Sequence, residues 1–166
     1  RTDFDLSAHE KFSGRKLQYF DPERNENYVP YVVETSIGLD RMFLALFSNC
    51  LKDEVLEDGS ERTVLSLPPA LAPVKAAILP LVKKDGLPEF AEKIFNDLKY
   101  DFNVISEEKD SIGKRYRRQD AIGTPFCITV DHDSLADGTV TLRERDTMKQ
   151  ERVKVEDLRR IIDEKV

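Results

Sequence analysis

The chain has 166 residues, of which 40% are hydrophobic and 35% charged, and its net charge is −6. The length suits one domain with an appendage, and the composition excludes a disordered chain. No apolar run approaches the roughly 20 residues that span a bilayer, so we expect no membrane segment. The sequence starts without Met and reads from its first residues like the middle of a fold, so we expect a piece of a longer protein.

The first third of the chain predicts a strand and a helix separated by a short break. Residues 28–34 are rich in β-branched and aromatic side chains, which predicts a strand. After a break at residues 35–38, apolar side chains recur at helical spacing from Leu39 to Phe47. Residues 53–62 are charged and include an Asp-Gly pair, which predicts a linker between two domains.

This linker divides the chain into an N-terminal piece, residues 1–52, and a C-terminal domain, residues 63–166. In the second part, strand and helix patterns alternate and are then followed by consecutive strands. This order predicts an α/β fold, a mixed sheet flanked by helices. The strands are expected at residues 74–82, 101–105, 126–130, 139–143 and 152–155, and the helices at 87–98, 111–121 and 158–162.

The usual signatures of a self-contained enzyme are missing from the sequence. It has no Walker loop, no dinucleotide fingerprint and no paired cysteines for zinc, so we expect no metal site. Cys50 and Cys127 are far apart in apolar surroundings, which favours two buried, reduced thiols and a cytosolic protein. His9 and His132 lie beside acidic residues, a setting more typical of the surface than of a catalytic site.

One short segment joins the predicted strand to the predicted helix and carries groups that suit a ligand. Glu34 offers a carboxylate, Ser36 a hydroxyl, and Gly38 lets a ligand approach the backbone. Arg41 can bind phosphate with its planar, permanently charged guanidinium. The spacing alone also fits a capped helix, with Thr35 or Ser36 as the N-cap and Arg41 in solvent.

Residues 28–47 resemble motif 3 of class II aminoacyl-tRNA synthetases. The wording Glu-Thr-Ser-x-Gly-Leu-Asp-Arg at residues 34–41 is similar to that of glycyl-tRNA synthetase. The stretch before it is similar to the end of that family's catalytic domain, and the chain after the linker is similar to its anticodon-binding domain. The resemblance covers nearly the whole chain and favours a ligand site over a capped helix. Its downstream blocks are residues 67–73, 110–127 and 139–148.

The resemblance assigns roles to the residues of motif 3. It implies that Arg41 and Gly38 contact ATP, with Arg41 on the phosphate, and that Glu34 and Ser36 hold the ammonium group of glycine. The family reaction activates glycine with ATP and Mg²⁺ as glycyl-adenylate and then transfers glycine to its tRNA. Motif 2 of the family is absent from these residues, so the chain alone is expected to be inactive and to bind no cofactor tightly.

A basic cluster in the second domain gains a role from the same resemblance. Lys114, Arg115, Arg117 and Arg118 lie close together on a predicted helix, with a tyrosine among them. The resemblance implies that they bind the anticodon stem-loop of glycine tRNA, because lysine and arginine bind the RNA backbone. The alternative is a solvated helix face paired with acidic neighbours. Weaker candidates for RNA contact are Phe102, Arg143 and Arg145.

The resemblance further implies a cytoplasmic enzyme that forms a homodimer when full length. Two alternatives stay open. One is a non-catalytic nucleic-acid-binding protein built on the same scaffold. The other is the C-terminal part of a threonyl-, prolyl- or histidyl-tRNA synthetase, against which the Glu-Thr-Ser element at residues 34–36 favours glycine.

Overall fold

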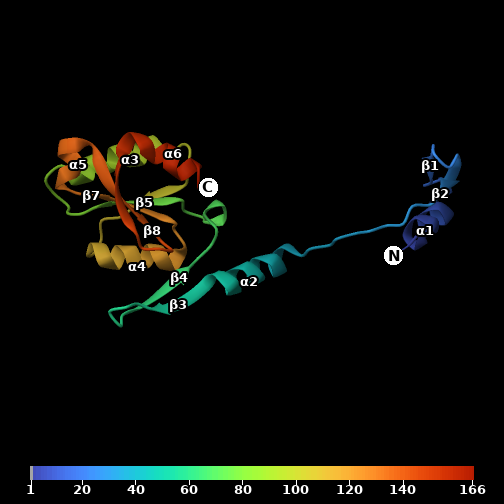
Figure 1. The fold of residues 1–166 in the computed structure, drawn as a ribbon, viewed down its shortest axis with the longest axis horizontal. Coiled ribbons are helices and arrows are strands. Elements are labelled where there is room, and N and C mark those ends of the chain that lie inside the picture. The colour runs from blue at the N-terminus through green and yellow to red at the C-terminus, as the bar shows by residue number, and fades with distance from the viewer. Residues whose placement is uncertain (1) are drawn as a thin grey trace. The chain divides into compact units, whose positions relative to one another are not determined.

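The computed structural model describes residues 2–166 and consists of two compact units, which are divided along the chain between Met42 and Phe43 (Figure 1). In the first unit, α1 (Phe4–Ser13) precedes the antiparallel strands β1 (Tyr19–Asp21) and β2 (Glu26–Tyr28). None of these three elements was predicted. α1 has few apolar residues and buries none of them, and strands of three residues are too short to show an alternation of polar and apolar side chains.

The strand predicted at residues 28–34 is wrong over most of its length. β2 ends at Tyr28, and residues 29–38 form neither helix nor strand. β-branched and aromatic residues favour an extended backbone, but a strand also needs a neighbour to complete its hydrogen bonds, and Pro30 lacks an N–H to donate. The following helix is confirmed as α2 (Leu39–Cys50).

The segment predicted as a linker is a hairpin in the second unit. β3 (Leu51–Val55) pairs antiparallel with β4 (Glu61–Leu65), with Leu51 opposite Leu65 and Val55 opposite Glu61. The charged residues that suggested a linker lie mostly on the outer side and in the turn of the hairpin. Arg62 and Val64, at alternate positions of β4, are buried where the hairpin packs on the rest of the unit.

The second unit is built on a mixed sheet of five strands, as predicted. The strand order is β6-β5-β7-β8-β9, with β5 parallel to β6 and β7, and with β8 antiparallel to β7 and β9. β6 and β9 are therefore the two edges of the sheet. The strands are β5 (Ala76–Pro80), β6 (Val104–Ser106), β7 (Phe126–Val130), β8 (Thr139–Glu144) and β9 (Gln150–Lys154).

Helices cover both faces of this sheet (Figure 1). α3 (Leu87–Leu98) and α6 (Leu158–Asp163) pack on one face, where their buried leucines and isoleucines meet side chains such as Ile78 and Ile128. α4 (Ile112–Ile122) packs on the other face, against Leu79 and its neighbours. The opposite faces follow from the strand period of two, because Ile78 and Leu79 are consecutive residues of β5.

Short elements complete the unit. α5 (His132–Asp137) was not predicted, although Asp131 and Ser134 form a reciprocal capping box at its start. Two 3₁₀ turns cover Pro69–Leu71 and Val155–Asp157. Gly138 ends α5 with a left-handed backbone at φ +67° and directly precedes β8.

Candidate functional site

The predicted ligand segment lies in the first unit, on either side of the start of α2. Glu34, Ser36 and Gly38 are exposed in the non-helical stretch, and Arg41 is exposed in the first turn of the helix. α2 begins at Leu39, so the helix starts after Gly38 rather than after Thr35 or Ser36. Among the described residues, no hydrogen bond or ion pair engages the side chains of Glu34, Ser36 or Arg41, and these groups remain available to a ligand.

The four basic residues predicted on one helix have very different environments on α4. Arg115 is only 2% exposed, and its guanidinium donates to the carbonyl oxygens of Pro80 at 2.7 Å, Glu107 at 3.1 Å and Leu81 at 3.3 Å. Burial lowers the pKa of Arg115. This side chain ties together the ends of β5 and β6, so the structure argues against its predicted RNA contact.

Arg118 and Arg117 are half-buried and already engaged. Arg118 forms ion pairs with Glu107 and with Asp110, the latter at 2.9 Å, and its hydrogen bond lowers the pKa of Asp110. Arg117 donates to the hydroxyl of Ser60 at 3.0 Å. For Arg118 the alternative anticipated from the sequence applies, a basic side chain paired with acidic neighbours. Both arginines therefore have polar partners within the unit.

Lys114 differs from these arginines because it is exposed and has no ion-pair or hydrogen-bond partner among the described residues. Lys83 and Lys109, which lie just after the ends of β5 and β6, share both properties with Lys114 and with several lysines elsewhere in the second unit. Sequence reasoning missed them because both lie outside the dense basic cluster of residues 114–118. The available signal was their position, a few residues after the ends of the first two predicted strands.

These three lysines follow the carboxyl ends of neighbouring parallel strands. Lys83 follows β5, Lys109 follows β6, and Lys114 lies in the first turn of α4. From β5, which lies between β6 and β7, the chain goes first to β6 on one side and then to β7 on the other, so strand order reverses here. In open α/β sheets, ligands bind outside the carboxyl ends of the strands at such a point. We name this region, with its three lysines, the carboxyl edge.

The weaker candidates from the sequence are structural. Arg143 and Arg145 are 5% and 1% exposed, and Phe102 packs against the core. Arg143 binds both carboxylate oxygens of the fully buried Asp120, at 2.8 and 2.9 Å, and lies 4.8 Å from the ring centre of Tyr116. The tyrosine of the basic cluster is thus half-buried, with its ring near this guanidinium and its hydroxyl 2.6 Å from that of Thr129.

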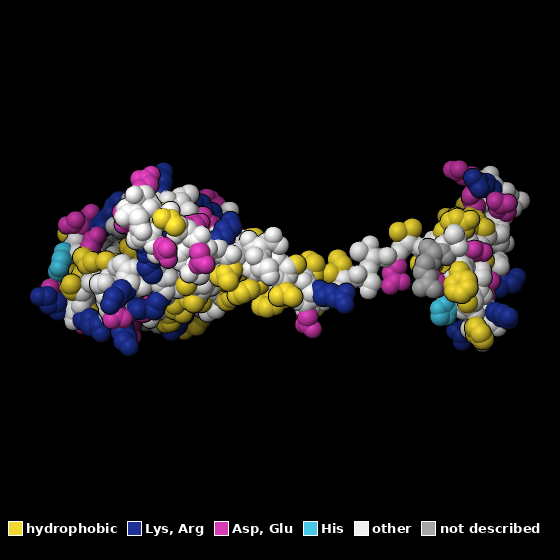
Figure 2. All heavy atoms as spheres, turned by 90° about the horizontal axis from the view of Figure 1, so that it is seen from below, with side chains coloured by type: hydrophobic (Ala, Val, Ile, Leu, Met, Phe, Trp, Pro, Cys, Tyr) yellow, Lys and Arg dark blue, Asp and Glu magenta, His cyan; other side chains and the backbone are white. Residues whose placement is uncertain are grey.

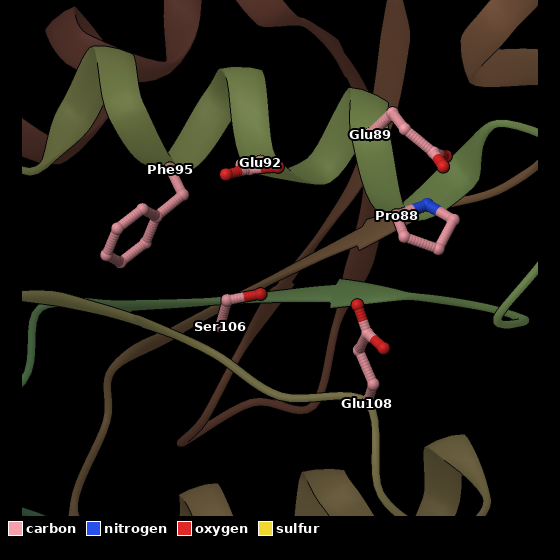
Figure 3. Close-up of a pocket in the computed structure, with 6 residues that line it drawn as sticks. All are labelled: Pro88, Glu89, Glu92, Phe95, Ser106 and Glu108. Atoms are coloured by element: carbon pink, nitrogen blue, oxygen red, sulfur yellow. The ribbon is translucent and has the colours of Figure 1, made fainter.

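A cavity of about 350 Å³ opens beside the edge strand β6. Phe95 and Glu92 of α3 lie above it, and Ser106 and Glu108 lie opposite the helix (Figure 3). Figure 2 shows basic and acidic side chains interspersed on the face of the second unit that it presents, without one uniform basic surface.

Comparison with known proteins gives this architecture a family. The sequence model described as "Anticodon binding domain" matches residues 75–165, which include the whole five-stranded sheet and α3 to α6. The chain belongs to the anticodon-binding-domain family. The carboxyl edge, the cavity beside β6 and the basic helix α4 all lie inside the matched residues of this anticodon-binding domain.

Curated relatives extend the likeness over the rest of the chain. It is 57% identical over 153 residues to a glycine–tRNA ligase of Chlorobaculum tepidum, covering 92% of this chain and 32% of that protein. It is 56% identical to the glycine–tRNA ligase of Clostridium perfringens, covering 98% and 35%, and 54% identical to that of Macrococcus caseolyticus, covering 100% and 36%. The chain thus spans about a third of the length of these relatives.

A solved structure supports the fold of the anticodon-binding domain. The RNA binding domain of threonyl-tRNA synthetase from Cryptosporidium parvum Iowa II superposes with a TM-score of 0.55 and 24% identity, covering 60% of this chain and 25% of that chain. Within residues 2–166, no helix has the length and apolar character needed to cross a membrane. The same residues contain no cluster of three or more His, Cys, Asp or Glu side chains that could hold a metal ion.

Proposed function

We propose that this chain binds the anticodon stem-loop of glycine tRNA through the carboxyl edge of its anticodon-binding domain. The full-length protein, of which this chain would be a part, would be a glycine–tRNA ligase. The observation that carries the proposal is the presence of three exposed, unpaired lysines at the strand ends of a domain whose family is described by anticodon binding. The names of the relatives favour glycine over the threonine, proline and histidine alternatives.

The chemistry of the edge suits an RNA loop. Phosphates of a loop are bound by lysine ammonium groups, and each such contact releases counterions, so affinity falls as salt rises. Bases in a loop are unstacked and can enter a protein cavity, where hydrogen-bonding groups read them. The carboxyl edge offers the lysines, and the cavity beside β6 adjoins Lys109 through its lining residue Glu108.

The test is the salt dependence of binding to an anticodon stem-loop. Replacing Lys83, Lys109 and Lys114 with Ala should reduce the slope of log affinity against log salt by about 2 units, because each phosphate contact contributes roughly 0.7 to 0.9. Replacing Arg117 and Arg118 should change the slope less, since both side chains are already engaged. The matched control removes three exposed lysines elsewhere in the second unit, Lys52, Lys149 and Lys154. Equal losses in both triple variants would reject the carboxyl edge.

The second part of the proposal concerns the substrate motif. In a full-length ligase, Arg41 would bind an ATP phosphate beside Gly38, and Glu34 and Ser36 would hold the glycine ammonium group. Support comes from their exposure and from the absence of competing partners for Glu34, Ser36 and Arg41 among the described residues.

Kinetics of the full-length enzyme test these roles. Glu34→Gln keeps the shape and removes the charge, and should cost about 2–4 kcal/mol in kcat/KM for glycine while the KM for ATP moves much less. Arg41→Ala should lower activity by about 10²-fold or more. Glu26→Gln, an exposed carboxylate in β2, is the control and should change neither quantity. Normal glycine kinetics in Glu34→Gln would remove Glu34 from the substrate site.

The 166 residues alone should not exchange pyrophosphate into ATP in the presence of glycine, because they lack motif 2. Dimerisation and a cytoplasmic location belong to the same proposal for the full-length enzyme. Analytical ultracentrifugation of the full-length protein would test the dimer, with a monomer as the result that contradicts it.

A further inference from the structure

The hairpin β3–β4 stands where a flexible linker would ordinarily join two parts of a chain. α2 ends at Cys50, and β3 begins at the next residue, Leu51. At the base of the hairpin, the backbone N–H of Ser66 donates to the carbonyl oxygen of Cys50 at 2.8 Å. The second half of α2, residues 43–50, lies in the same compact unit as the hairpin. The hairpin precedes residues 75–165, so the match to the anticodon-binding family assigns it no role.

One face of α4 holds the hairpin at two successive turns of the helix. Figure 1 shows α4 and β4 next to each other. Arg117 donates to the hydroxyl of Ser60, in the turn of the hairpin, at 3.0 Å. One turn further along α4, the carboxylate of Asp120 accepts from Arg62 of β4 at 3.2 Å. Residues three apart share one face of a helix, so a single face of α4 binds both the turn and the second strand of the hairpin.

The chain that leaves the hairpin is held to the same helix. A Cβ at Gly123, the residue that ends α4, would lie 3.0 Å from the carbonyl oxygen of Leu65, so the end of α4 and the end of β4 approach closely. Arg145 is buried and donates to the carbonyl oxygens of Gly123 at 2.8 Å and of Leu67 at 2.7 Å. This one side chain therefore ties the exit of the hairpin to the end of α4.

Arg62 is the side chain that anchors the hairpin. It is buried, and its guanidinium binds the carboxylate of Glu54 on the facing strand β3 at 2.6 Å. The same group binds the carboxylate of Asp120 and donates to the carbonyl oxygen of Arg145 at 2.8 Å. A planar guanidinium holds several partners in a fixed geometry, which a lysine ammonium group does not. Without Arg62, Asp120 would still be paired with Arg143, so the domain would keep this ion pair while the hairpin lost its anchor.

We propose that the hairpin is a rigid joint between α2 and the anticodon-binding domain, with Arg62 as its positioning residue, and that attachment of glycine to tRNA depends on this joint whereas activation of glycine does not. The inference rests on the proposed function, in which one tRNA is bound at its anticodon by this domain and charged at a site that includes residues 34–41. Two linked sites bind one partner together only when their geometry matches it. Activation uses glycine and ATP alone, so it needs no such match.

The experiment compares two activities of the full-length enzyme at a temperature where circular dichroism shows each variant folded. In Arg62→Met, kcat/KM for attachment of glycine to tRNA should fall roughly 10- to 100-fold, as expected when a bound group is misplaced. Glycine-dependent exchange of pyrophosphate into ATP, and affinity for the isolated anticodon stem-loop, should stay within about twofold because neither needs both sites at once. Arg62→Lys keeps the charge without the planar fork and should recover part of the loss.

A control and a second perturbation accompany this variant. Thr63 is exposed on the other side of β4, and its hydroxyl donates to Asp53 across the hairpin at 2.6 Å. Thr63→Val removes this bond, leaves Arg62 in place and should change neither activity. Inserting Gly-Ser-Gly-Ser between Cys50 and Leu51 separates α2 from the hairpin without altering a buried side chain. This insertion should reproduce the selective loss of tRNA charging, so the test does not depend on whether Arg62→Met folds.

The outcomes separate this inference from the proposed function. If Arg62→Met or the insertion lowers pyrophosphate exchange as much as tRNA charging, the hairpin acts only through stability and the inference is overturned. Normal tRNA charging in either folded variant overturns it as well. If the unmodified full-length enzyme does not attach glycine to a tRNA at all, the proposed function fails, and this inference fails with it.

Discussion

The buried charges around Asp120 give the sharpest prediction about stability. The Asp120 carboxylate is fully buried and contacts two guanidinium groups, that of Arg143 at 2.8 Å and that of Arg62 at 3.2 Å. Asp120→Asn keeps the shape but leaves two buried arginines with one negative charge fewer. Breaking a buried ion pair by removing one partner costs about 3–5 kcal/mol, because the remaining charge stays desolvated. We expect a loss of free energy of unfolding in this range.

Urea denaturation followed by circular dichroism at pH 7 measures this loss. With a slope of about 2 kcal/mol per molar urea, the midpoint should fall by roughly 2 M. Arg160→Ala is the matched control, since Arg160 is 60% exposed and its ion pairs with Asp157 and Glu164 should contribute at most about 1 kcal/mol.

A double variant tests whether the buried charge is the cause. Arg62 keeps a second partner, Glu54, at 2.6 Å. Adding Arg143→Met to Asp120→Asn removes the arginine that has no other carboxylate at hand, so the double variant should lose less than the sum of the single variants. A loss below about 1 kcal/mol for Asp120→Asn, or strict additivity in the double variant, would refute the reasoning.

Three further predictions follow from other buried and paired groups. Arg115→Met should lower the free energy of unfolding by about 2–4 kcal/mol by leaving buried carbonyls unpaired. The slope of log RNA affinity against log salt should stay unchanged in the folded variant. A reduced slope would show that Arg115 does contact the RNA. Burial raises the pKa of the Cys127 thiol to about 12, so a disulfide reagent at pH 8 should label Cys50 in the native protein and Cys127 only after unfolding in urea; fast native labelling of both would contradict this. The hydrogen bond from Arg152 lowers the pKa of Asp131 below its ordinary 3.8, so this ion pair contributes stability above that pH and loses it as the pH falls through the folded pKa. The difference in unfolding free energy between the unmodified protein and Arg152→Met should therefore shrink below about pH 4. A constant difference across a pH series would argue against the pair.

Periodicity predicted the elements that build the sheet of the second unit, and it did so because those elements bury continuous apolar stripes. β7 was predicted at its observed bounds, since all five of its residues are buried. α3 likewise buries Leu87, Ala91, Ile94 and Leu98 at helical spacing. The hairpin β3–β4 was missed for the opposite reason, because its outer residues are charged and only its packing on the unit makes it a structural element.

The candidate site was harder to predict because the buried side of α4 is polar. Arg115, Gln119 and Asp120 occupy positions where a helix normally places apolar residues, so nothing in the sequence distinguished Arg115 from its exposed neighbour Lys114. The partners that bury these groups, such as Arg143, come from other elements. Conversely, Lys83 and Lys109 are far apart in sequence, and only the parallel pairing of β5 and β6 brings them to the same end of the sheet.

The two edges of the sheet also bear on how the domain behaves at high concentration. β6 contains three residues and is followed at once by a charged segment, residues 107–110. β9 is longer, but Glu151, Arg152 and Lys154 are exposed charged side chains along it. Short or charged edge strands are poor templates for pairing with another chain. The domain should therefore resist aggregation by strand addition, which suits a protein that must leave one end of its sheet open to solvent.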